Sequence, residues 1–247
     1  MVDPASFASL LVRAREVKAD LEQRIHRQAV ERPTWTAGVD ARAAGLQDLW
    51  NVLRTSELSL VFIDWHLGDP AWWTRLRGSQ LNPRQVEFEF IAYSQGSKFG
   101  VFHLAASSVE NTLRCLLRAL APEAAKGARG EFKAVYECLL RTHLHLPHDD
   151  LLLLDLVRLT RNTMHNAGVH LPPSRRSERL RFQDVDYDFG EATSLEFVTW
   201  RFVLDRIGDL QALLDRVVRA DPLWTKPDAI AADWADAYQR ARKPHPA

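Results

Sequence analysis

Apolar residues recur every three or four positions along most of this chain, and this spacing limits the fold more than any other feature. An α-helix turns once in about 3.6 residues, so such spacing gathers apolar side chains on one face. It predicts helices over residues 4–31, 43–54, 84–120, 132–144, 149–168, 191–219 and 228–242, a break near Gly96 or Gly100, and a short buried helix or turn over 58–67. Period-two alternation over 182–189 predicts a short β-hairpin. We therefore expect an all-α helical bundle with one short hairpin.

Prolines and turn residues divide the chain into three predicted parts. They are an N-terminal helical layer or subdomain (1–81), a main helical bundle (82–220) and a C-terminal helix (221–247). Five of the eight tryptophans lie in the first part: Trp35, Trp50, Trp65, Trp72 and Trp73. Aromatic faces can stack on single-stranded nucleic acid, but these side chains have mostly apolar or acidic neighbours in the sequence. We expect them to pack in a core.

The balance of positive and negative charges means that the chain as a whole has no electrostatic attraction for nucleic acid. Lys plus Arg and Asp plus Glu number 32 each, so any binding of nucleic acid must come from a local basic patch. The start of the chain lacks the pattern of a signal peptide, and charges interrupt the apolar stretches. We expect a cytoplasmic protein without a membrane segment, in which Cys115 and Cys138 are buried free thiols.

Residues 149–168 form the most unusual predicted helix, because its polar face carries arginine, histidine and asparagine. Arg158, Arg161 and His165 fall within an arc of about 60° on the helical wheel. They could be an ordinary charged face, with Arg158 paired to Asp155, Arg161 in solvent and His165 interacting with the helix dipole. However, asparagine is a poor helix former, and Asn162 and Asn166 accompany them. This face is therefore a candidate site.

A second polar stripe runs along the predicted helix 84–120, which is otherwise largely apolar, and we expect this stripe to face other polar groups. Its members recur every three or four residues: His103, Ser107, Glu110, Asn111, Arg114 and Arg118. The other candidate cluster, residues 143–150, combines three histidines with two aspartates, which are metal-ligand types. Pro147 forces a turn between those histidines, and Asp149 and Asp150 suit the start of the next helix. We therefore expect no metal and no cofactor.

The residues Arg161, Asn162, His165 and Asn166 near the end of a helix resemble the signature of the HEPN superfamily. These are small helical-bundle domains, and many of them are metal-independent ribonucleases. In that signature an arginine, often followed by asparagine, precedes the histidine with four to six residues between them. Arg161 is followed by Asn162 but has only three residues before His165, whereas Arg158 has six residues before His165 and lacks the asparagine. Either arginine can take the family role.

The resemblance implies RNA as substrate and a role for each polar residue. His165 would transfer the proton, Arg158 and Arg161 would hold the phosphate, and Asn162 would orient the substrate or His165. The supporting residues would be Asn166 and three residues of the second polar stripe, which would face the motif helix: Glu110, Asn111 and Arg114. DNA would be inert because it lacks the attacking 2′-hydroxyl. The basic residues that follow the motif helix would bind the RNA backbone, or lie in a solvated loop: Arg175, Arg176, Arg179 and Arg181.

The resemblance further implies a homodimer whose two motif helices form a composite cleft. Leu151 and Leu154 lie within the polar arc, where they would meet a second copy or another helix of the same chain. The implied role is a toxin or defence effector with an antitoxin or defence-system partner. Two alternatives remain open: a catalytically silent HEPN-like module for dimerisation or for binding a nucleotide or partner, and an unrelated helical scaffold.

Overall fold

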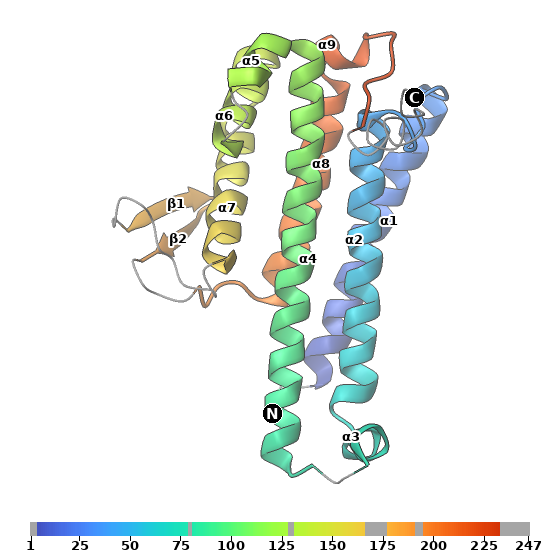
Figure 1. Cartoon of the computed structure of the whole chain (residues 1–247), viewed down its shortest axis with the longest axis vertical. Coiled ribbons are helices and arrows are strands. Elements are labelled where there is room, and N and C mark those ends of the chain that lie inside the picture. The colour runs from blue at the N-terminus through green and yellow to red at the C-terminus, as the bar shows by residue number, and fades with distance from the viewer. Residues whose placement is uncertain (1–3, 79–80, 128–130, 166–176, 191–194, 233–247) are drawn as a thin grey trace, which may run out of the picture.

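The computed structural model describes residues 4–78, 81–127, 131–165, 177–190 and 195–232. They form a bundle of α-helices with one two-stranded antiparallel hairpin, which confirms the predicted fold class (Figure 1). The long helices are α1 (Pro4–Glu31), α2 (Ala41–Phe62), α4 (Pro83–Leu120) and α8 (Trp200–Arg219). The helix that carries the Arg-Asn motif is α7 (His148–His165), which packs against α4 and α8.

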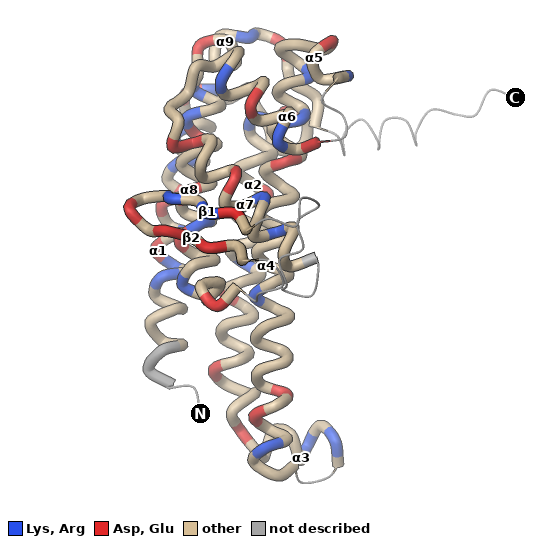
Figure 2. The backbone as a smooth tube through the Cα atoms, turned by 90° about the vertical axis from the view of Figure 1, so that its left-hand side faces the viewer, with Lys and Arg blue, Asp and Glu red and all other residues tan. Residues whose placement is uncertain are grey.

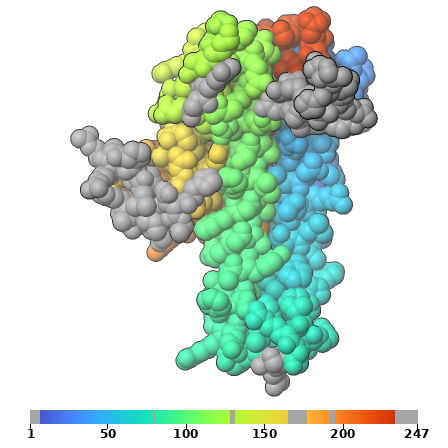
Figure 3. All heavy atoms as spheres, in the orientation of Figure 1, coloured from blue at the N-terminus to red at the C-terminus, as the bar shows by residue number. Residues whose placement is uncertain are grey.

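Nearly all of the buried apolar residues in the described part of the chain form one hydrophobic core. It extends from Phe7 in α1 to Ala232 after α8, and it includes buried residues of α2, α4 and α7. The helices α1 and α2 pack on each other and on α8, and α2 also packs on α4, so the first third of the chain contributes to this core. Figure 3 shows α4 along one face of the molecule, with α7 on one side and α2 on the other.

The helix α4 runs unbroken for 38 residues, so the predicted break near Gly96 or Gly100 is wrong. Both glycines have open space where a side chain would stand, and the helical hydrogen bonds continue through them. At its start, the Asn82 side chain accepts from the Gln85 backbone while the Gln85 side chain accepts from the Asn82 backbone. This reciprocal cap and Pro83 at the first helical position fix where the helix begins.

Several predicted helices have different bounds in the structure. α2 continues into a π-helix, η1 (Ile63–Leu67), and α3 (Pro70–Arg77) follows. The prediction for 132–144 becomes α6 (Phe132–Tyr136) and a second π-helix, η2 (Glu137–His143). Three short helices were not predicted: α3, α5 (Pro122–Gly127) and α9 (Asp221–Trp224).

The predicted start of the helix over 191–219 is also wrong. α8 begins at Trp200, because the Thr199 hydroxyl accepts from the Phe202 backbone and caps the helix there. Residues 228–232 are not helical, since Ala231 forms an isolated bridge with Asp40. The rest of that predicted helix lies outside the described residues, as do residues 166–168 at the end of the helix predicted over 149–168.

The predicted hairpin is confirmed and begins earlier than the alternation suggested. β1 (Glu178–Phe182) pairs with β2 (Val185–Phe189), with Phe182 opposite Val185. Gln183 and Asp184 make the two-residue turn at φ 48° and 59°, as a tight hairpin that follows the strand twist requires. β1 contacts α7, and Phe182 and Phe189 are buried.

The predicted core tryptophans divide by burial. Trp35 and Trp73 are buried, Trp50 and Trp72 are half-buried, and Trp65 is 68% exposed. Core packing is therefore confirmed for the first two and wrong for Trp65.

Three further features of the sequence can be compared with the structure. Neither cysteine is in a disulfide, as expected; Cys115 is buried, whereas Cys138 is only half-buried. Leu151 and Leu154 are buried within the chain, so they give no support to a dimer. Among the described helices, none is both long and apolar enough to span a membrane.

Candidate functional site

Glu110 of α4 joins the polar stripe to the motif helix. Its carboxylate accepts hydrogen bonds from Arg161 of α7 and from Arg114 one turn further along α4, the latter at 2.9 Å from Nε and 2.6 Å from Nη2. Burial acts to raise the pKa of Glu110, but the bonds from Arg161 and Arg114 outweigh it and hold that pKa below its ordinary value. The predicted pairing of the two stripes is confirmed, and Arg161 is not the solvated residue of the ordinary-face interpretation.

Arg158 is held by a second network, which includes a tyrosine that sequence reasoning missed. The Tyr136 hydroxyl donates to Asp155 at 2.6 Å, and Arg158 donates to Asp155 at 3.0 Å from Nη2 and to the Tyr136 oxygen at 3.4 Å from Nε. Burial and the bond to Asp155 raise the pKa of Tyr136. A buried tyrosine hydroxyl normally has a partner, which is the signal that could have identified it. The predicted Asp155–Arg158 pair is confirmed.

The two networks border one cavity of about 280 Å³ between α4, α6 and α7. Its lining combines four cationic side chains with two carboxylates: Ala106, Glu110, Arg114, Glu131, Phe132, Lys133, Val157, Arg158, Arg161 and Asn162. Although the chain has no net charge, the lining is locally positive. Guanidinium groups bind phosphate in bidentate fashion, so the cavity has the chemistry of an anion site.

The remaining residues predicted in and beside the motif helix are placed only in part. Asn162 is exposed and lines the cavity, whereas Asn111 is half-buried on α4 and is not part of the lining. His165 is the last residue of α7, one helical turn beyond Arg161, and its side chain lies outside the described part of the structure. Asn166 lies outside it as well.

The predicted backbone-binding arginines do not join this cavity where they are described. Arg179 and Arg181 lie on β1 with side chains 82% and 66% exposed, and they pair with Asp188 and Asp184. The hairpin 178–189 carries these two arginines and four acidic residues, so its net charge is negative (Figure 2). Arg175 and Arg176 lie outside the described residues.

The histidine and aspartate cluster spans the start of α7, and Asp149 and Asp150 lie in the first turn of this helix, as predicted. Asp150 is also buried and accepts hydrogen bonds from Arg216 of α8. His145 Nδ1 lies 3.1 Å from the backbone oxygen of Arg141. Across the described ranges, no group of three His, Cys, Asp or Glu side chains has the arrangement of a metal site.

Comparison of the chain with family models, with curated proteins and with solved structures finds no match.

Proposed function

We propose that this protein is a metal-independent, HEPN-like endoribonuclease whose site is the cavity between α4, α6 and α7. The observation that carries the proposal is that Arg158 and Arg161 line one cationic cavity, with Asn162 beside them and His165 one turn further along the same helix. A ribose phosphate that enters the cavity meets guanidinium groups, and the only further requirement is a group that transfers protons.

The reaction would be attack of a 2′-hydroxyl on the adjacent phosphorus. The hydroxyl proton passes to a base, the bond to the 5′-oxygen breaks, and that oxygen takes up a proton, leaving a 2′,3′-cyclic phosphate. His165 suits the proton transfers because an unperturbed imidazole has a pKa of about 6.5. Arg158 and Arg161 would stabilise the charge that develops on the phosphoryl oxygens.

Glu110 holds Arg161 in place before the substrate arrives. Because its carboxylate shares Arg161 with any incoming phosphate, the substrate must compete with an internal anion. Two copies of the chain would pair through their motif helices, so that residues of both copies form one composite site. The protein would act in the cytoplasm. The biological role would be that of a toxin or defence effector restrained by an antitoxin or partner protein.

The decisive experiment incubates the purified protein with RNA in EDTA, beside His165→Ala, Arg161→Ala and the control Arg201→Ala. Arg201 is a suitable control because it is 62% exposed and pairs only locally, with Asp205. We expect cleavage that leaves 2′,3′-cyclic phosphate ends, is lost in the first two variants and persists in the control. Absence of cleavage at high protein concentration, or equal cleavage by His165→Ala, would contradict the proposal. Arg158→Ala beside Arg161→Ala identifies the arginine that contacts phosphate.

A second candidate function is a catalytically silent module that dimerises or binds a nucleotide or a partner. It is favoured by the observation that Arg114, Arg158 and Arg161 all have carboxylate partners within the chain. Binding of a nucleotide that Arg161→Ala abolishes, without cleavage of any RNA, would support it over the enzyme.

A further inference from the structure

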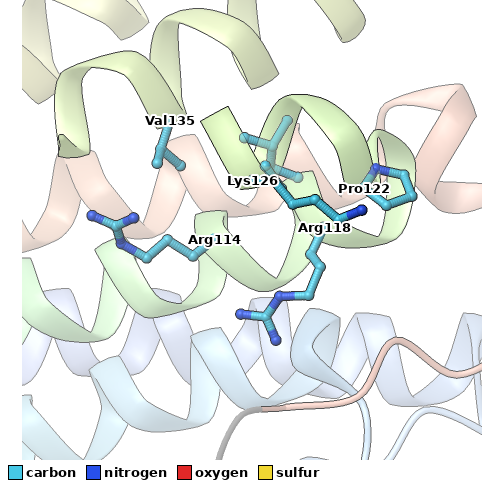
Figure 4. Close-up of a pocket in the computed structure, with 7 residues that line it drawn as sticks. Arg114, Arg118, Pro122, Lys126 and Val135 are labelled. Atoms are coloured by element: carbon cyan, nitrogen blue, oxygen red, sulfur yellow. The ribbon is translucent and has the colours of Figure 1, made fainter. Parts of the chain in front are cut away.

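A second cavity lies beside the candidate site and is also lined by cations. Its volume is about 370 Å³, and it is bordered by α4, α5 and α6 (Figure 4). The lining residues are Arg114, Leu117, Arg118, Pro122, Ala125, Lys126 and Val135. Three of these seven are cationic, and this lining includes no carboxylate. An anion is the ligand that such a surface favours.

Arg114 connects the two cavities, because it lines both of them. The short helix α6 also borders both, through Phe132 and Lys133 on one side and Val135 on the other. Arg114 and Arg118 are four residues apart on α4, which separates them by about 6 Å along the helix axis. The two cavities therefore adjoin, on the side of α4 that faces α5 and α6.

The cationic groups of the second cavity are spread out. In Figure 4 the side chains of Arg114, Arg118 and Lys126 extend in different directions around the cavity and do not converge on one point. This arrangement suits a chain of successive anions better than a single phosphate. The Lys126–Glu123 pair is no obstacle, since Lys126 is 58% and Glu123 83% exposed, and exposed ion pairs contribute little.

We propose that the second cavity binds the backbone of single-stranded RNA next to the phosphate held in the first cavity. This inference rests on the proposed function, because it assigns the first cavity to the scissile phosphate. Arg118 and Lys126 would contact phosphates of neighbouring nucleotides, and Arg114 would lie between the two positions. The rest of the lining is aliphatic and does not hydrogen-bond to base edges, so the contacts fix the position of the strand without reading its sequence.

The test measures binding separately from cleavage. The probes are fluorescent 2′-O-methyl RNA oligonucleotides, which lack the attacking hydroxyl: a dinucleotide with one internal phosphate and a longer single strand. The variant is Arg118→Gln with Lys126→Gln. The matched control is Arg75→Gln with Arg84→Gln, which removes the same charge from exposed positions at the far end of the molecule, in α3 and at the start of α4 (Figure 1).

For the longer strand, we expect the variant to bind several-fold more weakly at low salt. The slope of log affinity against log salt should become shallower by about 1.4, because each lost phosphate contact on a single strand contributes about 0.7. Binding of the dinucleotide should match the wild type, and the control pair should retain most of the affinity for the longer strand. Thermal unfolding checks that both double variants are folded.

The outcomes separate this inference from the proposed function. Wild-type affinity and slope in the variant, an equal loss in the control pair, or no binding of the longer strand by the wild type would overturn the inference. If the expected losses occur but unmodified RNA is not cleaved, the second cavity binds RNA and the proposed enzyme is wrong. If RNA is cleaved but the losses do not occur, the enzyme stands and this assignment fails.

Discussion

Glu110 is the residue on which the candidate site depends most. It provides the negative charge shared by Arg114 and Arg161, which come from two different helices. The pKa of Glu110 in the folded protein lies below the ordinary value of 4.5. The ionised carboxylate therefore makes its full contribution to stability at pH values above 4.5. The contribution is lost as the pH falls through the folded-state pKa, because the proton then binds and both arginines lose their partner.

Replacing Glu110 by Gln should lower stability at neutral pH by about 2 kcal/mol, the size of a charge-assisted hydrogen bond. The melting temperature of the variant should also fall less steeply with pH below about 4.5 than that of the wild type. Thermal unfolding followed by circular dichroism across pH measures both effects. Glu16→Gln is the control, because Glu16 is 60% exposed and its pair with Arg13 is local. Equal melting temperatures of Glu110→Gln and the wild type at pH 7 would refute the prediction.

At the scale of helices and strands, the sequence predicts those helix bounds that the spacing of apolar residues determines. The bounds of α1 and nearly those of α4 follow from apolar periodicity. The contact between Glu110 and the motif helix follows from the family resemblance, which implies that the second stripe faces this helix. The pairing of Tyr136 with Asp155 depends on how α6 and α7 are placed, which no spacing within either helix reveals.

The placement of neighbouring elements also decides between the two alternatives for Leu151 and Leu154 of α7, a second copy or another helix of the same chain. A helical wheel divides a helix into one buried and one exposed face, but α7 contacts α4, α6, α8, η2 and β1. Leu151 and Leu154 are therefore covered by the chain itself. The π-helices were missed because a single extra residue per turn leaves little trace in an apolar pattern.

The crossing of α2 and α4 depends on Gly45. A Cβ built at Gly45 would lie 2.7 Å from both Cγ2 and Oγ1 of Thr112, closer than side chains tolerate. Gly45→Ala should therefore destabilise the protein by about 1–3 kcal/mol despite the better helix propensity of alanine. Urea unfolding measures the change in free energy.

A second substitution tests the cause. Thr112→Ala removes both atoms in conflict, so the double variant should be more stable than Gly45→Ala alone, and the two effects should not add. Additive losses, or a Gly45→Ala protein as stable as the wild type, would show that the close approach is not what requires glycine.

At the scale of the whole molecule, a buried arginine at the start of α2 forms hydrogen bonds with the segment of the chain that follows α8. Arg42 is fully buried, forms an ion pair with Asp40 and lies 3.8 Å from the centre of the Trp35 ring. Its guanidinium donates to the backbone oxygens of Leu223, Lys226 and Asp228 at 2.8–2.9 Å. Five donors on one rigid group can satisfy a segment that has little regular secondary structure of its own.

Arg42→Ala should therefore cost about 3–5 kcal/mol, because Asp40 is left buried without its counter-charge and three carbonyl groups lose a donor. The segment 225–232 should become a site of limited proteolysis before the rest of the bundle is cut, since its backbone contacts would open first. Arg54→Ala is the matched control, an exposed arginine of the same helix. Unfolding of Arg42→Ala in urea at the wild-type midpoint, or a first cleavage outside 225–232, would contradict this prediction. Either result would show that core packing, and not Arg42, stabilises the segment 225–232.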